Sequence, residues 1–202
     1  MNYFITGIDT DSGKTLAAAV LCEALEADYW KPVQAGAPKD SDTVRKLLSN
    51  QRSVIHRESF FLTTPASPHA AAKIDGIEIS ISKFFKPQTT NNLIIEGAGG
   101  CLVPLNDNEF VIDLALHFEA TVILVADLYL GSINHTLLTW HELASRKLNV
   151  KGIIFNGPPN AESERIILHH TGLPCLLKMA REENVGRETV KKYASLLKQT
   201  WV

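Results

Sequence analysis

The stretch Phe4–Thr15, FITGIDTDSGKT, decides how the rest of the chain is interpreted. The apolar run at its start predicts a buried strand, and the segment LAAAVLCEALEA that follows Thr15 predicts a helix. A strand, a glycine-containing loop, Gly-Lys-Thr and a helix are the parts of a phosphate-binding P-loop, in that order. Amide groups at the helix start, together with the positive end of the helix dipole, bind anionic oxygens.

The loop departs from the usual P-loop spacing at one position. The pattern G-x-x-x-x-G-K-[ST] puts its first glycine at position 8, where this chain has Ile8, and Gly7 lies one residue earlier. The order of strand, loop and helix still favours nucleotide phosphate binding over a structural glycine turn with no ligand. In that function Lys14 reaches the outer phosphates and the Thr15 hydroxyl ligates Mg²⁺.

The composition is that of an ordinary globular protein of 202 residues, which predicts one domain over residues 1–202. A net charge of -2 gives no electrostatic case for nucleic acid or an anionic membrane as partner. No apolar run is long enough to cross a membrane, and no basic leader precedes the first strand. Three widely spaced cysteines form neither a disulfide framework nor a metal-binding pair, so we expect a cytoplasmic protein.

Predicted strands alternate with predicted helices along the whole chain. The aliphatic runs Leu93–Ile95 and Thr121–Ala126 are typical of strands buried on both faces, as in a parallel sheet between helices. No linker or internal repeat interrupts the alternation. The sequence therefore predicts the α/β class, as a P-loop NTPase-like three-layer α/β/α fold with a mainly parallel sheet.

Three charged residues lie where such a fold places its ligands. Lys31 ends the short predicted strand Tyr29–Lys31, where it either serves the site or is an exposed lysine with no role. Glu96 ends a buried strand before a glycine-rich turn, where P-loop NTPases hold Mg²⁺ with an acidic residue, and this favours function. Asp42 is interpreted more readily as the cap of the following helix than as a carboxylate facing Mg²⁺ and phosphate.

Two further positions have equally open interpretations. Asn156 ends another predicted strand, where it either reads a base edge or shapes the turn. Ser132 or Asn134 either caps the helix that follows Gly131 or forms a nest that binds a carboxylate.

Six segments in this order resemble the dethiobiotin synthetase family of biotin biosynthesis. They are GIDTDSGKT at 7–15, KPVQAG at 31–36, SD at 41–42, T-x-x-A-S-P-H ending at 69, EGAGG at 96–100 and LGSINH at 130–135. The shifted glycine of the phosphate loop is what this family shows. The resemblance implies a cytoplasmic, homodimeric ligase that uses ATP, Mg²⁺, CO₂ and 7,8-diaminononanoate.

The implied reaction forms a cyclic urea. One amine captures CO₂ as a carbamate, the γ-phosphate of ATP activates it as a mixed anhydride, and the second amine closes the ureido ring. The products are dethiobiotin, ADP and phosphate. Carbamate and γ-phosphate are both anionic, so Lys14, Lys31 and Mg²⁺ suit the role of neutralising them.

The resemblance also implies roles for individual residues. Lys31 and Lys14 would be catalytic, and Thr15, Asp42 and Glu96 would hold the metal. The residues implied for nucleotide binding are Asp11, Ser12, Gly13, Lys14, Thr15, Leu16, Asp42, Glu96, Gly97, Ala98, Gly99 and Asn156, the last of which reads adenine. Those implied for the substrate are Thr10, Ala35, Leu130, Gly131, Ser132 and Asn134, and the loop at 130–134 holds the substrate carboxylate from the neighbouring subunit.

Two places depart from the family pattern, and one other class of protein competes. Ala35 stands where the family usually has a hydroxyl residue, and residues 176–184 poorly keep the family's segment near adenine. The alternative class is a partner-switching P-loop ATPase of the partition or septum-positioning kind. Those proteins carry a second lysine early in the phosphate loop, where this chain has Gly7, Ile8 and Asp9.

Overall fold

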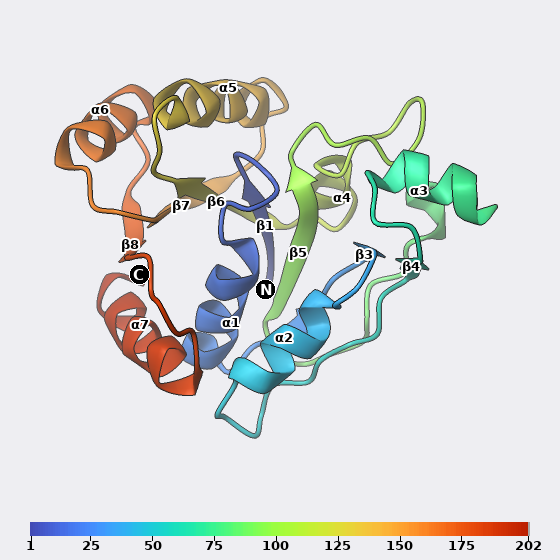
Figure 1. Cartoon of the computed structure of the whole chain (residues 1–202), viewed down its shortest axis with the longest axis horizontal. Helices are drawn as coiled ribbons and strands as arrows, with labels where there is room; N and C mark the ends of the chain where they lie inside the picture. Colours follow the sequence, from blue (N-terminus) through green and yellow to red (C-terminus); the bar gives the residue numbers. More distant parts are fainter. Residues whose placement is uncertain (202) are drawn as a thin grey trace.

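The strand that leads into the phosphate loop, β1 (Asn2–Gly7), lies inside a six-stranded sheet (Figure 1). The computed structural model describes residues 1–201 of the predicted 1–202 domain. The strand order is β2-β5-β1-β6-β7-β8 and every pairing is parallel. The other strands are β2 (Asp28–Trp30), β5 (Leu93–Gly100), β6 (Thr121–Asp127), β7 (Val150–Asn156) and β8 (Cys175–Met179).

Helices cover both faces of this sheet (Figure 1). One face carries α1 (Lys14–Leu25), α7 (Arg187–Thr200) and α2 (Asp40–Leu47), and the other carries α4 (Asp113–His117), α5 (Ser132–Ser145) and α6 (Ala161–Thr171). Two apolar clusters result, one on each face, because the central strands are apolar on both sides. The predicted three-layer α/β/α fold is confirmed.

A second, two-stranded parallel sheet lies beyond the end of β2. It pairs β3 (Val33–Ala35) with β4 (Phe60–Leu62), and α3 (Pro68–Asp75) and a short 3₁₀ helix, η1 (Ile81–Lys83), follow β4. Gly36 has φ +72°, and a side chain there would place its Cβ 2.7 Å from that of Pro65. This close approach holds the loop after β3 against the loop after β4, near the carboxyl end of β5.

Parallel strands put all their carboxyl ends at the same edge of the sheet. The loops after β1, β2 and β5 therefore meet, although they are far apart in the chain. This edge is the usual ligand-binding edge of open α/β sheets. None of the helices within residues 1–201 is both long and apolar enough to cross a membrane.

Candidate functional site

The phosphate loop runs from Ile8 to Gly13, between β1 and α1. Ile8 still donates its N–H to the carbonyl of Val125 at 3.1 Å, and its side chain packs against the core. The close crossing occurs at Gly7, where an added Cβ would lie 2.0 Å from Ser12 Oγ. The glycine is needed at position 7 rather than 8, which explains the irregular spacing of the motif.

The start of α1 is left open to an anion. Its N-cap is Gly13, with φ 92° and ψ 20°, and neither a side-chain cap nor an acidic first-turn residue competes for the helix amides. Lys14 is buried, and its Nζ donates to the carbonyls of Asp9 at 2.7 Å and Thr10 at 2.8 Å. Burial and the nearby Lys31 ammonium lower the pKa of Lys14 to about 8.

Glu96, on β5, accepts hydrogen bonds from α1, from β2 and from the residue that follows β2. Its Oε1 accepts hydrogen bonds from Thr15 Oγ1 at 2.9 Å and from Lys31 Nζ at 3.0 Å. Its Oε2 accepts from Tyr29 Oη at 2.8 Å. The side chain is only 1% exposed, so this carboxylate is buried and depends on these donors for its stability.

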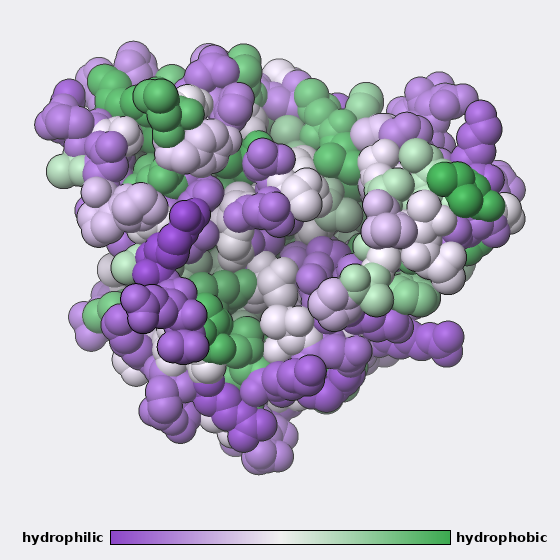
Figure 2. All heavy atoms as spheres, in the orientation of Figure 1, coloured by the Kyte–Doolittle hydropathy of each residue, from purple (hydrophilic) through white to green (hydrophobic). Residues whose placement is uncertain are grey.

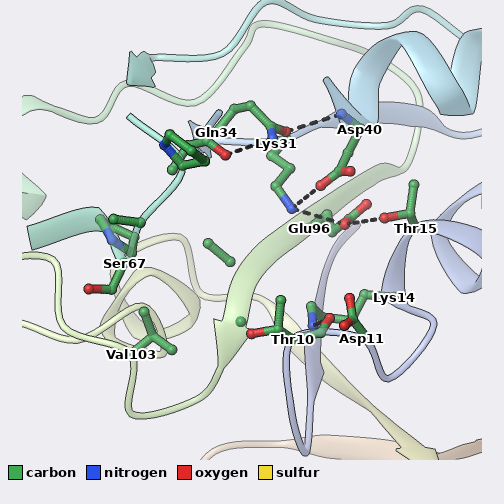
Figure 3. A pocket seen from close by; sticks show the side chains of 16 residues that line it. Thr10, Asp11, Lys14, Thr15, Lys31, Gln34, Asp40, Ser67, Glu96 and Val103 are labelled. Atoms are coloured by element: carbon green, nitrogen blue, oxygen red, sulfur yellow. Dashed lines mark hydrogen bonds and ion pairs between the residues drawn. The ribbon is translucent and has the colours of Figure 1, made fainter. Parts of the chain in front are cut away.

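Lys31 lies between two carboxylates, as Figure 3 shows. Its Nζ is 2.5 Å from Asp40 Oδ2 and 3.0 Å from Glu96 Oε1, and it also donates to the carbonyl of Gly97 at 3.3 Å. Burial alone lowers a lysine pKa, but Glu96 and Asp40 outweigh it, and the pKa of Lys31 is raised. Lys31 is therefore held as a buried cation and is not the exposed strand-end lysine that the sequence also allowed.

A cavity of about 470 Å³ lies over these groups. The phosphate-loop side contributes Thr10, Asp11, Lys14 and Thr15, and the strand ends contribute Lys31, Asp40 and Glu96. The opposite wall comes from Gln34 and Ala35 of β3 and from residues 65–68 after β4, and Ala98, Gly99 and Val103 close the side. In Figure 2 the surface is hollowed near its centre, where polar side chains gather. One side of the cavity thus carries two lysines among three carboxylates, and the other combines apolar and small polar groups.

The oxygen donors of this cavity fit Mg²⁺ bound together with phosphates. Within residues 1–201 no cluster of three or more His, Cys, Asp or Glu residues forms a complete metal cage. Mg²⁺ in nucleotide sites needs none, because one or two carboxylates or hydroxyls act with water and phosphate oxygens. The Thr15 hydroxyl and the Glu96 carboxylate, 2.9 Å apart, supply such a pair.

Asp42 is not part of this arrangement. Its side chain is 54% exposed and pairs with Arg45 at 2.6 Å on the surface of α2. The helix starts at Asp40, with Lys39 as N-cap, so Asp42 is not the cap residue either. The acidic side chain of α2 that lines the cavity is Asp40, which no sequence pattern indicated.

The remaining predicted positions divide into two groups. Ser12, Gly13, Leu16 and Gly97 belong to the segments that form the cavity, and Asn156 reaches the phosphate loop from β7, donating to the Ser12 carbonyl at 3.2 Å. The predicted substrate loop lies elsewhere, at the start of α5, where Leu130 and Gly131 line a separate cavity of about 360 Å³. Ser132 is buried there and Asn134 is exposed. A single chain does not bring this loop into the cavity over Lys31.

Comparison with known proteins identifies the family. The AAA domain family model matches residues 1–189. An ATP-dependent dethiobiotin synthetase BioD of Cytophaga hutchinsonii is 58% identical over 201 residues, covering 98% of each chain. Others, from Christiangramia forsetii and Chlamydia felis, are 47% and 42% identical over at least 94% of each chain. The chain belongs to the dethiobiotin synthetase family.

Solved structures of other proteins share the fold at low sequence identity. A ParA family ATPase from Chlorobium tepidum matches 98% of the chain with a TM-score of 0.56 and 13% identity. The cell division ATPase MinD of Pyrococcus furiosus matches with a TM-score of 0.57 and 15% identity. These likenesses show a common P-loop architecture and nothing about the reaction. The resemblance noted from the six sequence motifs is confirmed by the family relatives.

Proposed function

We propose that this protein is an ATP- and Mg²⁺-dependent cyclo-ligase that converts 7,8-diaminononanoate and CO₂ into dethiobiotin, with release of ADP and phosphate. The observation that carries the proposal is the position of Lys31. It lies buried between Glu96 and Asp40 and lines the same cavity as the phosphate loop. Family membership supplies the substrate class, and the cavity supplies room for a triphosphate terminus beside a second anion.

The residues of this chain act by charge and position. The α1 amides and Lys14 bind the phosphates, while Lys31 neutralises the carbamate oxygen that approaches the γ-phosphorus. Thr15 and Glu96 would hold Mg²⁺, which would supply shielding of the phosphate charge. The carbamate oxygen forms a bond to the γ-phosphorus while the bond from that phosphorus to the ADP oxygen breaks. The second amine then attacks the carbonyl carbon, and phosphate leaves.

The proposal includes a homodimer in which the loop at 130–134 of one subunit completes the substrate site of the other. Leu130 is fully exposed, and Leu138 and Leu102 are 60% and 47% exposed. Figure 2 shows hydrophobic groups on the upper part of the molecule, where α5 lies. Apolar side chains at such a surface support an interface.

All three cysteines are free, which supports a cytoplasmic location.

The direct test combines the protein with ATP, Mg²⁺, bicarbonate and 7,8-diaminononanoate, and measures phosphate release and the cyclic urea product by mass spectrometry. Both are expected to depend on the diamine. Phosphate release at the same rate without the diamine, and no cyclic product, would favour a partner-switching ATPase instead. Analytical ultracentrifugation tests the dimer, and a Leu130→Ser variant is expected to weaken it.

A further inference from the structure

Tyr29 is a buried tyrosine whose hydroxyl contacts the candidate site from the side of the apolar core. It lies in the middle of β2 with no exposed surface, within the apolar cluster that packs under α1. Its Oη donates to Glu96 Oε2 at 2.8 Å, while the other oxygen, Oε1, accepts from Thr15 and Lys31. Thr15 and Lys31 line the cavity, and Tyr29 does not.

This geometry divides the two oxygens of Glu96 between two tasks. Oε1 faces groups that a bound nucleotide and metal engage, so its hydrogen bonds exchange during binding. Oε2 faces a phenol whose ring is fixed by core packing. The phenol has one O–H, and in this contact it donates that hydrogen to the carboxylate oxygen. Tyr29 thus holds the carboxylate when the other two donors turn to a ligand.

We propose that Tyr29 is a positioning residue for metal–nucleotide binding: its hydroxyl fixes Oε2 of Glu96 so that Oε1 faces the cavity beside Thr15. The inference rests on the metal role that the proposed function gives to Glu96. Groups that orient a metal-binding carboxylate through a hydrogen bond commonly change metal affinity about 10–100-fold when removed. Removal of the Tyr29 hydroxyl frees a buried carboxylate oxygen, which then turns toward another donor.

The test is Tyr29→Phe, which keeps the ring and removes the hydroxyl. Mn²⁺ serves as the probe, and its binding to the protein–ADP complex is measured by electron paramagnetic resonance. We expect Mn²⁺ affinity to fall about 10-fold or more, while ADP affinity without metal stays unchanged. The matched control is Tyr3→Phe, since Tyr3 belongs to the same core cluster. Within residues 1–201 its hydroxyl forms a hydrogen bond only to Met1 Sδ, at 3.3 Å. Its Mn²⁺ affinity is expected to equal that of the unchanged protein.

A double variant separates positioning from simple stability. In a Glu96→Gln protein, where the carboxylate is already absent, Tyr29→Phe is expected to cause no further loss of Mn²⁺ affinity. A Tyr29→Phe protein that unfolds at a lower temperature yet binds Mn²⁺ normally would make the role structural and overturn the proposal. An equal loss in the Glu96→Gln background would overturn it too. The assay contains no diamine, so failure of ring closure leaves its result unaffected.

Discussion

Two buried carboxylates near opposite ends of the β2–β5 pairing have different partners. Asp28 begins β2, while Glu96 lies in the middle of β5, which continues to Gly100 where the sequence predicted a turn, and each carboxylate is 1% exposed. Asp28 accepts from the Val54 amide at 3.0 Å and from Asn91 Nδ2 at 2.9 Å, and its Oδ2 lies 3.0 Å from His56 Nε2. Those partners tie loops to the sheet, and Asp28 lines no cavity described here.

Glu96 differs in what its donors face and not in how deeply it is buried. Two of its donors, Thr15 and Lys31, line a cavity of about 470 Å³, where a ligand can contact them. One of them is a cation that a second carboxylate, Asp40, also holds. Burial and hydrogen bonding alone therefore do not identify a functional carboxylate. The decisive feature is that its partners open onto a cavity.

Removal of Lys31 is expected to have the largest effect. Lys31→Ala deletes the buried cation that faces the carbamate, so turnover with the diamine falls about 100-fold or more, while ADP affinity survives. The steady-state rate of cyclic urea formation measures turnover, and calorimetry measures ADP affinity. The control is Lys178→Ala, which removes another lysine paired with a buried glutamate, Glu164, at 2.5 Å. Normal turnover in Lys31→Ala would show that Lys31 has only a structural role.

Removal of Lys14 is expected to act on binding as well as on rate. Lys14 donates to the carbonyls of Asp9 and Thr10, and a bound phosphate would replace these acceptors with stronger, charged ones. A hydrogen bond to a charged group contributes about 1.5–3 kcal/mol, which corresponds to about 10–100-fold weaker ADP binding in Lys14→Ala. Equilibrium titration with ADP checks this, and an unchanged affinity would contradict the phosphate role of the loop.

Asp28→Asn is expected to change stability and leave chemistry alone. The substitution keeps the shape of the side chain but turns one acceptor into a donor facing Val54 N or Asn91, at a cost of about 1–3 kcal/mol. Urea unfolding measures the loss, and the turnover of the folded protein stays unchanged. A large loss of turnover at urea concentrations below the unfolding transition would contradict the proposed difference between Asp28 and Glu96.

The smallest expected effect is a pH dependence of that stability. Burial raises the pKa of Asp28, but hydrogen bonds from Asn91 and other donors outweigh it and the pKa is lowered. A lowered pKa contributes stability that is complete above the ordinary carboxyl value of about 4 and is lost as the pH falls below it. The difference in free energy of unfolding between the unchanged protein and Asp28→Asn should therefore shrink below about pH 4. A constant difference from pH 6 to pH 3 would contradict this.

Much of the fold and the phosphate loop could be predicted from the sequence, because local patterns carry them. The run Leu93–Ile95 is a buried strand, and the helix after Gly13 begins where the motif places it. Glu96 could be selected because a charge at the end of an apolar strand has few other purposes. That residues 1–202 form one domain stays a prediction.

Side-chain direction and long-range contacts could not be predicted. Asp40 and Asp42 are separated by about 200° around a helix, so the exact start of α2 decides which one faces Lys31. Tyr29 is an ordinary core residue by pattern, and its contact with Glu96 spans 67 positions of the chain. Residues 65–68 form a cavity wall only because the β3–β4 sheet folds toward β5.

The strand order also has a consequence for how the protein folds. β1 is made first, but it lies between β5 and β6, where Tyr3 pairs with Ile94 on one side and Thr121 on the other. Contacts of such high sequence separation form slowly, because a long stretch of chain must first be closed into a loop. During synthesis the phosphate loop can therefore reach its native shape only after β6 has left the ribosome. Until then, the most recognisable motif of the chain belongs to an unpaired strand.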